Sequence, residues 1–280
     1  MKPIIKPQEL VPMLQQEALI LIDARSGPTA KDKYEAEHLQ DALYVDLETD
    51  LARPTANAAE GGRHPLPSAQ EFAEFLGQLG IQPSSHVVVY DDVSGANAAA
   101  RFWWMLKALG HEQVQVLDGG YAAAVAAGIP TSNQTEQPAA QAPYPQQGWQ
   151  LPLAEVEEVE RAAQEADSLV IDVRAAARYR GETEPIDLVA GHVPGAINIP
   201  YTSNLDSNGF YLSPAALREK YEKALDNRKT ENVMVHCGSG VTACHTLLAM
   251  DYAGMEIPKL YIGSWSEWSR SGREIATGEK

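Results

Sequence analysis

The sequence contains very little cysteine. Cys237 and Cys244 are the two cysteines among 280 residues, and seven positions separate them. Two cysteines are too few for a disulfide framework, and without a second cluster of ligands they do not form a zinc site. We therefore expect free thiols, a reducing compartment and no bound metal.

Long hydrophobic runs are also missing near the start of the chain. The apolar run at residues 18–22 ends at Asp23. A membrane-spanning helix needs roughly 18 apolar residues, and the core of a signal peptide needs at least about 7. We therefore expect no membrane partner and a cytoplasmic location.

Positive charge is scarce. The chain has 22 Lys and Arg residues against 38 Asp and Glu residues, which gives a net charge of −16. Such a chain is repelled by the phosphates of nucleic acids and by anionic lipids, so we expect neither as a partner. An acidic enzyme that acts on a small anion must also supply positive charge locally, at its site.

An internal repeat is the most informative feature that is present. Four short segments recur in the same order, at offsets of 144 to 154 residues. The pairs are LIDAR at 21–25 and VIDVR at 170–174, EHLQDA at 37–42 and GHVPGA at 191–196, VVVYD at 87–91 and VMVHC at 233–237, and LDGGY at 117–121 and YIGSW at 261–265. The chain is therefore predicted to be a duplicated domain.

Each half alternates short β-branched runs with helical stretches, which is typical of an α/β fold with a parallel sheet flanked by helices. The clearest helical stretches are residues 68–79, 98–109, 154–165 and 214–225. Ser68 and Glu71 fit a capping box at the start of the first of them. Residues 131–148 are rich in Gln and Pro and predict an extended linker. The predicted organisation is a first domain at 1–130, the linker at 131–148 and a second domain at 149–280.

The chemistry is predicted to lie where a buried strand of the second half ends in a glycine-containing loop and a helix opens. Cys237 is the first residue after this strand, and the helix is predicted to begin near Val241. Backbone amides converge at such a place and the helix N-terminus adds positive potential, so it favours an anion and a reactive thiolate. The residues expected to line the anion are Gly238, Gly240, Val241 and Thr242.

A cysteine taken at random is most often a small buried hydrophobe. The position of Cys237 favours a nucleophile instead, whereas Cys244 keeps the ordinary interpretation as a core residue. Asp91 stands at the equivalent place of the first half and cannot perform thiol chemistry, so the first domain is predicted to be inactive. His236, one residue before Cys237, is interpreted as a packing residue.

Two arginines follow the strand that contains Asp172. Arg178 and Arg180 lie toward the carboxyl end of the predicted sheet, where a guanidinium can bind a carboxylate or sulfonate with two hydrogen bonds. The alternative is an ordinary solvated helix face. The histidines and aspartates of the repeat, His38, His192, Asp23 and Asp172, are expected to tie loops together.

These motifs resemble those of the tandem rhodanese-domain sulfurtransferases over essentially the whole chain. The resemblance rests on both Asp-x-Arg strands, on residues 191–196, on the loop CGSGVTAC at 237–244 and on GSWSEW at 263–268. It implies two rhodanese-like domains, an inactive first copy, catalysis through a persulfide on Cys237 and no cofactor.

The active loop also distinguishes subfamilies. Members that prefer thiosulfate have Cys-Arg-Lys-Gly, whereas the Cys-Gly-Ser-Gly of this chain is similar to members that prefer 3-mercaptopyruvate. The resemblance implies that Ser239 works with a histidine of the first domain, assigned to His38. The acidic partner that the family gives this histidine has no clean match in the chain, and Asp32 is the candidate.

The resemblance also implies that Arg178 binds the carboxylate of the donor. A second family arginine follows a Glu-Pro pair, but Ile186 stands there in this chain, and Arg180 is the substitute within the same segment. Arg63, in the stretch GRHPLP at 62–67, adds a further positive charge. Because residues 238–242 contain no cation, the loop itself is predicted to present only backbone amides and helix polarity to the donor.

The expected activity is transfer of sulfane sulfur from 3-mercaptopyruvate to Cys237 and then to a thiol or cyanide, with thioredoxin or glutathione as candidate acceptors. The alternatives are a thiosulfate:cyanide sulfurtransferase and a non-catalytic rhodanese-type binding module. The intact loop around Cys237 argues against the second. A cysteine phosphatase is disfavoured because no arginine occurs at 238–244.

Overall fold

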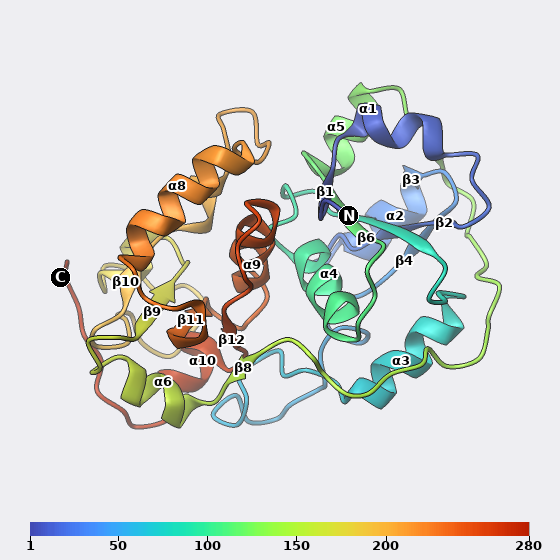
Figure 1. Cartoon of the computed structure of the whole chain (residues 1–280). Coiled ribbons are helices and arrows are strands. Elements are labelled where there is room, and N and C mark those ends of the chain that lie inside the picture. The colour runs from blue at the N-terminus through green and yellow to red at the C-terminus, as the bar shows by residue number, and fades with distance from the viewer. Residues whose placement is uncertain (280) are drawn as a thin grey trace. The chain divides into compact units, whose positions relative to one another are not determined.

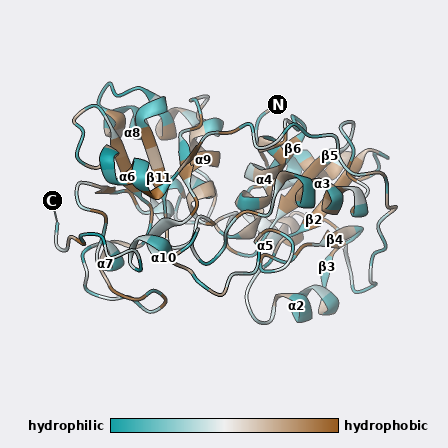
Figure 2. Cartoon of the chain, turned by 90° about the horizontal axis from the view of Figure 1, so that it is seen from below, coloured by the Kyte–Doolittle hydropathy of each residue, from teal (hydrophilic) through white to brown (hydrophobic). Residues whose placement is uncertain are grey.

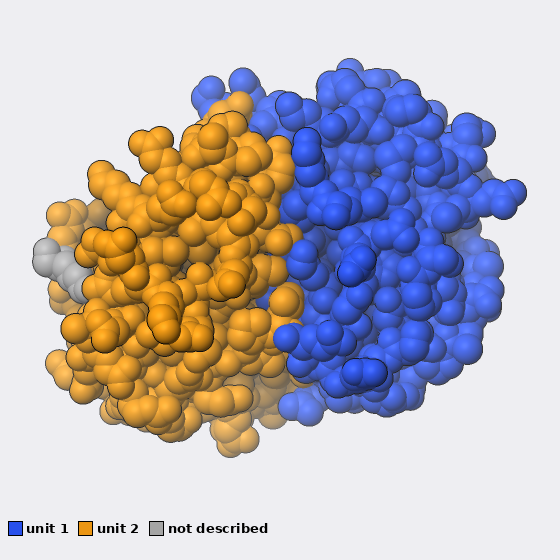
Figure 3. All heavy atoms as spheres, in the orientation of Figure 1, with its two compact units in different colours: residues 1–53, 67–150, 207–211 blue, residues 54–66, 151–206, 212–280 orange. Residues whose placement is uncertain are grey.

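The structure is a computed structural model, and it describes residues 1–279. The chain forms two compact units, shown in different colours in Figure 3. Unit 1 comprises residues 1–53, 67–150 and 207–211, and unit 2 comprises residues 54–66, 151–206 and 212 onward. Two segments therefore belong to a unit that their place in the sequence does not suggest. Residues 54–66 belong to unit 2, and residues 207–211 belong to unit 1.

Unit 1 is built on a five-stranded sheet in which every neighbouring pair of strands is parallel. The strands, in spatial order, are β1 (Ile4–Ile5), β6 (Val114–Leu117), β5 (His86–Tyr90), β2 (Leu19–Asp23) and β4 (Ala42–Tyr44). The central strands are buried along most of their length because they are apolar on both faces, as a parallel sheet between helices requires. A separate antiparallel pair joins β3 (His38–Leu39) to β7 (Thr131–Ser132).

The helices of unit 1 cover this sheet (Figure 1). They are α1 (Pro7–Leu10), the 3-10 helix η1 (Val11–Met13), α2 (Ala30–Ala36), α3 (Ala69–Gln78), α4 (Ala98–Ala108) and α5 (Gly120–Ala126). The predicted capping box is confirmed, because Ser68 Oγ accepts from the Glu71 amide and the Glu71 carboxylate accepts from the Ser68 amide. In Figure 2 the brown of the apolar residues is concentrated on the strands, whereas α2 is largely teal.

Unit 2 repeats the same design, with a five-stranded sheet whose neighbours are all parallel. Its strands, in spatial order, are β10 (Ile197–Asn198), β9 (Leu169–Asp172), β11 (Val233–His236), β12 (Lys259–Tyr261) and β8 (Leu153–Ala154). When the strands of the two units are paired according to the sequence repeat, both sheets have the same strand order. Strand β11 occupies the centre, as β5 does in unit 1, so the predicted duplication is confirmed.

The helices of unit 2 differ from the predicted ranges at two places. They are α6 (Val156–Ala162), α7 (Ala176–Tyr179), η2 (Tyr201–Asn204), α8 (Pro214–Leu225), η3 (Thr230–Asn232), α9 (Ala243–Tyr252) and α10 (Ser264–Trp268). The helix predicted at 154–165 begins later because Leu153 and Ala154 pair with β12 as an edge strand, and it ends earlier, at Ala162. Helix α9 begins two residues after Val241, because the glycine-containing loop continues to Thr242.

The repeated motifs form matching buried clamps in the two units. Arg25 Nη2 lies 2.7 Å from Asp23 Oδ2, and Arg174 Nη2 lies 2.6 Å from Asp172 Oδ2. Burial alone would raise the pKa of Asp172, but the charges of its partners and the hydrogen bonds from Arg174 outweigh burial and lower it. The Asp-x-Arg motif is therefore a structural clamp, as the sequence predicted.

No helix in the described part of the chain is long and apolar enough to cross a membrane.

Candidate active site

Cys237 is the first residue after β11, at the carboxyl end of the central strand of unit 2, as predicted. Its side chain is nearly buried, with an exposed fraction of 3% for the residue. The Cys237 amide donates to Ser264 Oγ at 3.2 Å, and the Cys237 carbonyl accepts from the Trp265 amide at 3.0 Å. The Gly238 carbonyl accepts from the Ser266 amide at 2.8 Å. The start of α10 therefore fixes the first two residues of the active loop.

The residues of the active loop differ in backbone conformation and burial. Gly240 has a φ of +74°, and a Cβ there would lie 2.6 Å from the Ile262 carbonyl oxygen, so only glycine fits. Val241 is buried, and Thr242 is the half-buried N-cap residue of α9. Gly238 has an ordinary backbone conformation, and the space beside it contains guanidinium groups. Cys244 is fully buried in α9, which agrees with its interpretation as a core residue.

The same loop in unit 1 shows where its backbone amides point. Asp91 Oδ1 accepts from the amides of Val93 at 2.9 Å and Gly95 at 2.8 Å, and Oδ2 accepts from the amide of Asn97 at 3.1 Å. Burial raises the pKa of Asp91, against the opposing effect of these hydrogen bonds. The amides of this loop converge on the side chain of its first residue, and in unit 1 that side chain already occupies them.

Ser239 lies in the active loop, two residues after Cys237, and its hydroxyl is paired with a histidine that the sequence reasoning missed. Ser239 Oγ lies 2.8 Å from Nδ1 of His64. Both residues belong to unit 2, because His64 lies on the segment 54–66. The pair is largely buried, which favours a directional hydrogen bond over exchange with water. The available signal is the stretch GRHPLP at 62–67, which contains this histidine next to Arg63.

The segment that carries His64 is docked onto α10 by backbone hydrogen bonds. The amide of Gly61 donates to Glu267 Oε1 at 2.8 Å, and the amide of Arg63 donates to Ser266 Oγ at 3.0 Å. Gly62 has a φ of +82°, and a Cβ there would lie 2.5 Å from the Gly263 carbonyl oxygen. The terminal GSWSEW motif therefore positions two separate stretches, the active loop and residues 61–64.

The structure gives Ser239 a different histidine from the one that the resemblance implied, and this corrects the assignment of His38. His38 is fully buried in unit 1, its Nδ1 lies 2.6 Å from the Tyr34 carbonyl oxygen, and its ring stacks on Tyr34 at 3.9 Å. His192 repeats this arrangement in unit 2, with 2.8 Å to the Tyr179 carbonyl and ring stacking at 3.7 Å. His38 therefore ties a loop to a helix, as the repeat suggested.

Asp32 is not the acidic neighbour of His38. It is exposed in the first turn of α2, and the acidic group that approaches the His38 ring is Glu136, with Oε1 at 4.0 Å from Nε2. A negatively charged side chain in the first turn of a helix interacts favourably with the helix dipole, and this explains the aspartate there.

Arg178 and Arg180 have different surroundings. Arg178 donates through Nη2 to Glu184 Oε1 at 2.8 Å and to Asp187 Oδ2 at 3.2 Å. A Cβ built on Gly238 would lie 3.5 Å from Arg178 Nη2, so this guanidinium flanks the active loop. Arg180 Nε instead donates to the exposed Glu182 at 2.6 Å. Of the two, Arg178 is the arginine that the structure brings to the loop.

A second guanidinium, that of Arg63, also flanks the active loop. A Cβ built on Gly238 would lie 3.4 Å from Arg63 Nη2, and Arg63 Nη1 is hydrogen-bonded to Asp187. Residues 238–242 themselves contain no cation, and the positive charge beside the loop lies on Arg63 and Arg178.

Glu184 lies beside Arg178 in this region. Burial by itself would raise the pKa of Glu184, but hydrogen bonds from Arg178 and from the amides of Asp187 and Ile186 lower it below its ordinary value. His236 is fully buried, and burial lowers its pKa, so it is the neutral packing residue that was predicted.

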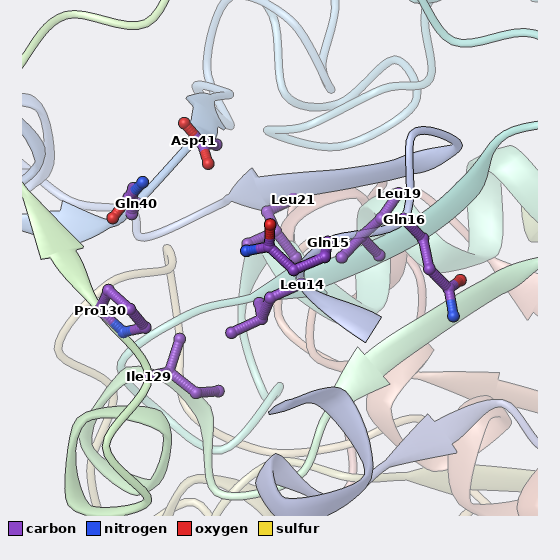
Figure 4. Close-up of a pocket in the computed structure, with 9 residues that line it drawn as sticks. All are labelled: Leu14, Gln15, Gln16, Leu19, Leu21, Gln40, Asp41, Ile129 and Pro130. Carbon is purple, nitrogen blue, oxygen red and sulfur yellow. The ribbon is translucent and has the colours of Figure 1, made fainter. Parts of the chain in front are cut away.

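A cavity of about 190 Å³ lies elsewhere, in unit 1 (Figure 4). It is lined by apolar and uncharged side chains with one carboxylate: Leu14, Gln15, Gln16, Leu19, Leu21, Gln40, Asp41, Ile129 and Pro130. Its lining contains neither a thiol nor a cation. Among residues 1–279, no group of three or more His, Cys, Asp or Glu side chains is placed to bind a metal ion.

Comparison with known proteins identifies the family of this chain. The family model of the rhodanese-like domain matches residues 6–127 and 155–271. The chain is 39% identical over 282 residues to a probable 3-mercaptopyruvate sulfurtransferase of Pseudomonas aeruginosa, covering 99% of this chain and 98% of that protein. It is 35% identical over 246 residues to a thiosulfate sulfurtransferase of Rattus norvegicus, covering 86% and 80%.

A solved structure supports the same relationship. The crystal structure of a 3-mercaptopyruvate sulfotransferase from Escherichia coli matches with a TM-score of 0.78 at 28% identity, covering 95% of this chain and all of that one. The chain therefore belongs to the rhodanese-like family, with two copies of the domain in tandem. It is an enzyme of the sulfurtransferase class.

Proposed function

We propose that this enzyme transfers sulfur from 3-mercaptopyruvate to Cys237 and then from Cys237 to a thiol or cyanide acceptor. The observation that carries the proposal is the surroundings of one loop. A thiol follows the central strand, the Ser239–His64 pair lies two residues further on, and Arg178 flanks Gly238. These are a nucleophile, a proton-handling pair and an anion site.

In the first step the Cys237 thiolate attacks the sulfur of the donor. A sulfur–sulfur bond forms and the carbon–sulfur bond of the donor breaks, so the bonding electrons pass to the three-carbon fragment as an enolate. Protonation of that carbanion equivalent yields pyruvate, and Cys237 holds a persulfide. In the second step an acceptor thiolate attacks the outer sulfur, and the Cys237 thiolate leaves.

The Ser239–His64 pair suits the charge that develops in the first step. Negative charge accumulates on the carbonyl oxygen of the donor as the carbon–sulfur bond breaks, and a hydroxyl donor directed at that oxygen stabilises the transition state more than the ground state. His64, bonded to Ser239 Oγ at 2.8 Å, accepts or returns the serine proton. Loss of either group is expected to lower the rate of sulfur loading by roughly 100- to 10,000-fold.

Thiosulfate is the second candidate donor, and it differs from mercaptopyruvate in the number and place of its charges. A thiosulfate sulfurtransferase is among the relatives, at 35% identity. Thiosulfate would place both charges close to the transferred sulfur, whereas mercaptopyruvate places a single carboxylate at its far end. An active loop without a cation of its own, flanked by arginines at Gly238, favours the second arrangement.

The test compares Cys237→Ser with Cys244→Ser, the matched control that removes the other thiol. With 3-mercaptopyruvate, the wild-type enzyme and Cys244→Ser should gain about 32 Da, the mass of one sulfur atom, on the peptide containing residue 237. Cys237→Ser should gain none and should transfer no sulfur. Values of kcat/KM for 3-mercaptopyruvate and thiosulfate, measured side by side, decide the donor. Activity remaining in Cys237→Ser would refute the nucleophile, and absence of sulfur uptake by the wild-type enzyme would support a binding module.

Acceptors are tested in the same assay. Thioredoxin, glutathione and cyanide, supplied separately to the loaded enzyme, should each be compared by the rate at which the added sulfur leaves residue 237. A thiol acceptor should be most effective as its thiolate, because the thiolate is the attacking species.

A further inference from the structure

Exposed apolar side chains are concentrated in one short segment of unit 2. Seven large apolar side chains of the described chain are exposed, and three of them are Ile186, Leu188 and Val189, at 57%, 67% and 40%. The other four are dispersed, at Met1, Val11, Val93 and Val125. Single exposed apolar residues need no explanation, whereas a cluster of them marks a surface that another molecule covers.

The backbone of this segment is fixed by buried contacts. Glu184 Oε1 accepts from the amides of Ile186 at 3.1 Å and Asp187 at 3.0 Å. The Val189 carbonyl accepts from Trp265 Nε1 at 2.8 Å, and the Asp187 side chain is fully buried. The fold therefore turns Asp187 inward and holds its two apolar neighbours toward solvent.

Asp187 also connects the segment to the active loop. Its carboxylate is bound by three guanidiniums, and two of these, on Arg63 and Arg178, flank Gly238, the residue after Cys237. Because Cys237 is 3% exposed, a molecule that takes sulfur from it must come close to this loop. A large acceptor in that position contacts the exposed apolar segment as well.

The surface beside the segment is positive as well as apolar. The side chains of Arg63, Arg178 and Arg270 are 16% to 26% exposed. Their partners Glu184 and Asp187 have buried side chains, so the cations of these ion pairs reach solvent and the carboxylates do not. In a chain with a net charge of −16, this is a place where an acidic partner is attracted and not repelled.

We propose that Ile186, Leu188 and Val189 form the docking surface for a protein acceptor of sulfur, which presents its thiol from an apolar surface with acidic residues at the edge. The assignment rests on the proposed function, which supplies the persulfide. The thiolate of the docked protein attacks the outer sulfur, the sulfur–sulfur bond breaks, Cys237 leaves as its thiolate and the acceptor holds the persulfide. A small apolar contact suits a partner that must leave after each transfer.

The experiment measures the second step alone, on full-length enzyme that already holds sulfur. Cys237 is loaded with inorganic polysulfide, the excess is removed, and a gain of about 32 Da on the peptide containing residue 237 verifies the loading. Loaded enzyme is then mixed with reduced thioredoxin, as the probe of a protein acceptor, or with dithiothreitol, a neutral small dithiol. In Ile186→Ser/Leu188→Ser, the second-order rate constant should fall about 10- to 100-fold for thioredoxin and change less than about 2-fold for dithiothreitol, because only the protein loses two apolar contacts.

Three controls accompany this comparison. Val11→Ser/Val125→Ser replaces two apolar residues of similar exposure in unit 1 and should leave both rates unchanged. Leu188→Met keeps an apolar side chain of similar volume and should retain the rate with thioredoxin. Raised ionic strength should slow transfer to thioredoxin and not to dithiothreitol, because charge complementarity acts on the protein partner alone.

Each result has a separate meaning. An unchanged rate with thioredoxin in Ile186→Ser/Leu188→Ser would overturn the docking surface, and so would equal slowing with dithiothreitol. Should thermal unfolding show that the double variant is not folded, Leu188→Ser alone is compared with Leu188→Met, and equal rates with thioredoxin would overturn the proposal. A wild-type enzyme that passes sulfur to thioredoxin no faster than to dithiothreitol would overturn it as well. Failure of 3-mercaptopyruvate to load Cys237 would instead refute the proposed donor and leave this result intact, because polysulfide bypasses the donor.

Discussion

Replacing Asp187 by Asn should shift donor preference toward the dianion thiosulfate. The Asp187 side chain is fully buried among three guanidiniums, so the substitution removes one negative charge and leaves their positions nearly unchanged. The ion-pair network beside the loop joins four guanidiniums to three carboxylates, in contacts among Arg63, Arg174, Arg178, Arg270, Asp172, Glu184 and Asp187. Its excess positive charge therefore rises from one to two. A dianionic donor carries one more negative charge than a monoanionic one and therefore gains more from this change.

The magnitude follows from the placement of the charge. A unit charge about 8 Å from the donor, at an effective dielectric constant of about 20, contributes roughly 2 kcal/mol, which corresponds to about 30-fold in the ratio of the two kcat/KM values. The same change destabilises the fold. Arginines that lose a buried partner cost about 3–5 kcal/mol, of which the asparagine oxygen recovers a part through its own hydrogen bonds.

The assay measures kcat/KM for thiosulfate and 3-mercaptopyruvate at low and high ionic strength, below the melting temperature of the variant. Glu182→Gln is the matched control, because it removes one negative charge from an exposed residue paired with Arg180. The ratio should move toward thiosulfate in Asp187→Asn and not in Glu182→Gln. An unmoved ratio in a folded Asp187→Asn variant would show that the charge of the network does not select the donor.

Two further predictions concern the docked segment and the stability of unit 2. Glu267→Ala removes the acceptor of the Gly61 amide and of the Tyr261 hydroxyl, so Arg63 and His64 should lose their positions. We expect kcat/KM to fall roughly 10- to 100-fold for both donors. An unaltered kcat/KM would mean that residues 61–64 are positioned by other contacts. Burial lowers the pKa of Lys220 to about 8 from 10.5, so the unfolded chain binds more protons between these values and the free energy of unfolding should rise with pH across that window. Lys220→Met should remove this rise, as urea denaturation at several pH values can check.

The fold was predictable because its signals are local or repeated. Short apolar runs buried on both faces and the capping box at Ser68 specify elements within a few residues, and the recurrence of the four segments specifies that the elements occur twice. Where a boundary was wrong, a long-range contact decided it. Leu153 and Ala154 form an edge strand because they pair with β12, and their own sequence continues smoothly into a helix.

Only the part of the candidate site that directly follows strand β11 was predictable from the sequence. Cys237 and Ser239 lie on a loop whose chemistry is visible in its own sequence. His64 and Arg63 reach that loop through contacts such as the one between Gly61 and Glu267, which are 206 residues apart. No periodicity or spacing encodes such a contact, since it depends on which surface the segment 54–66 packs against.

The misplaced histidine has a different cause. The role of His38 rests on resemblance alone, whereas its counterpart His192 occupies the equivalent position in unit 2. Two histidines at equivalent positions of a repeat, each bonded through Nδ1 to a carbonyl and stacked on a tyrosine, serve the shared framework. A group that performs chemistry in only one half is expected among the residues that the two halves do not share, as Cys237, Ser239 and His64 are.

Under the proposed function, the contrast between Asp91 and Cys237 explains how the same loop occurs in an inert and in a reactive copy. An aspartate oxygen lies the same number of bonds beyond Cβ as the outer sulfur of a cysteine persulfide, and both carry negative charge. In unit 1 the amides of Val93, Gly95 and Asn97 already bind the Asp91 oxygens, so that loop is permanently filled by its own side chain. A thiol at the same place is shorter and leaves the amides open until a second sulfur arrives. Under the proposed function, the arrangement around Asp91 is therefore the one that the loop of unit 2 would offer to the persulfide, with Ser239 and the two flanking arginines added to bring the donor to it.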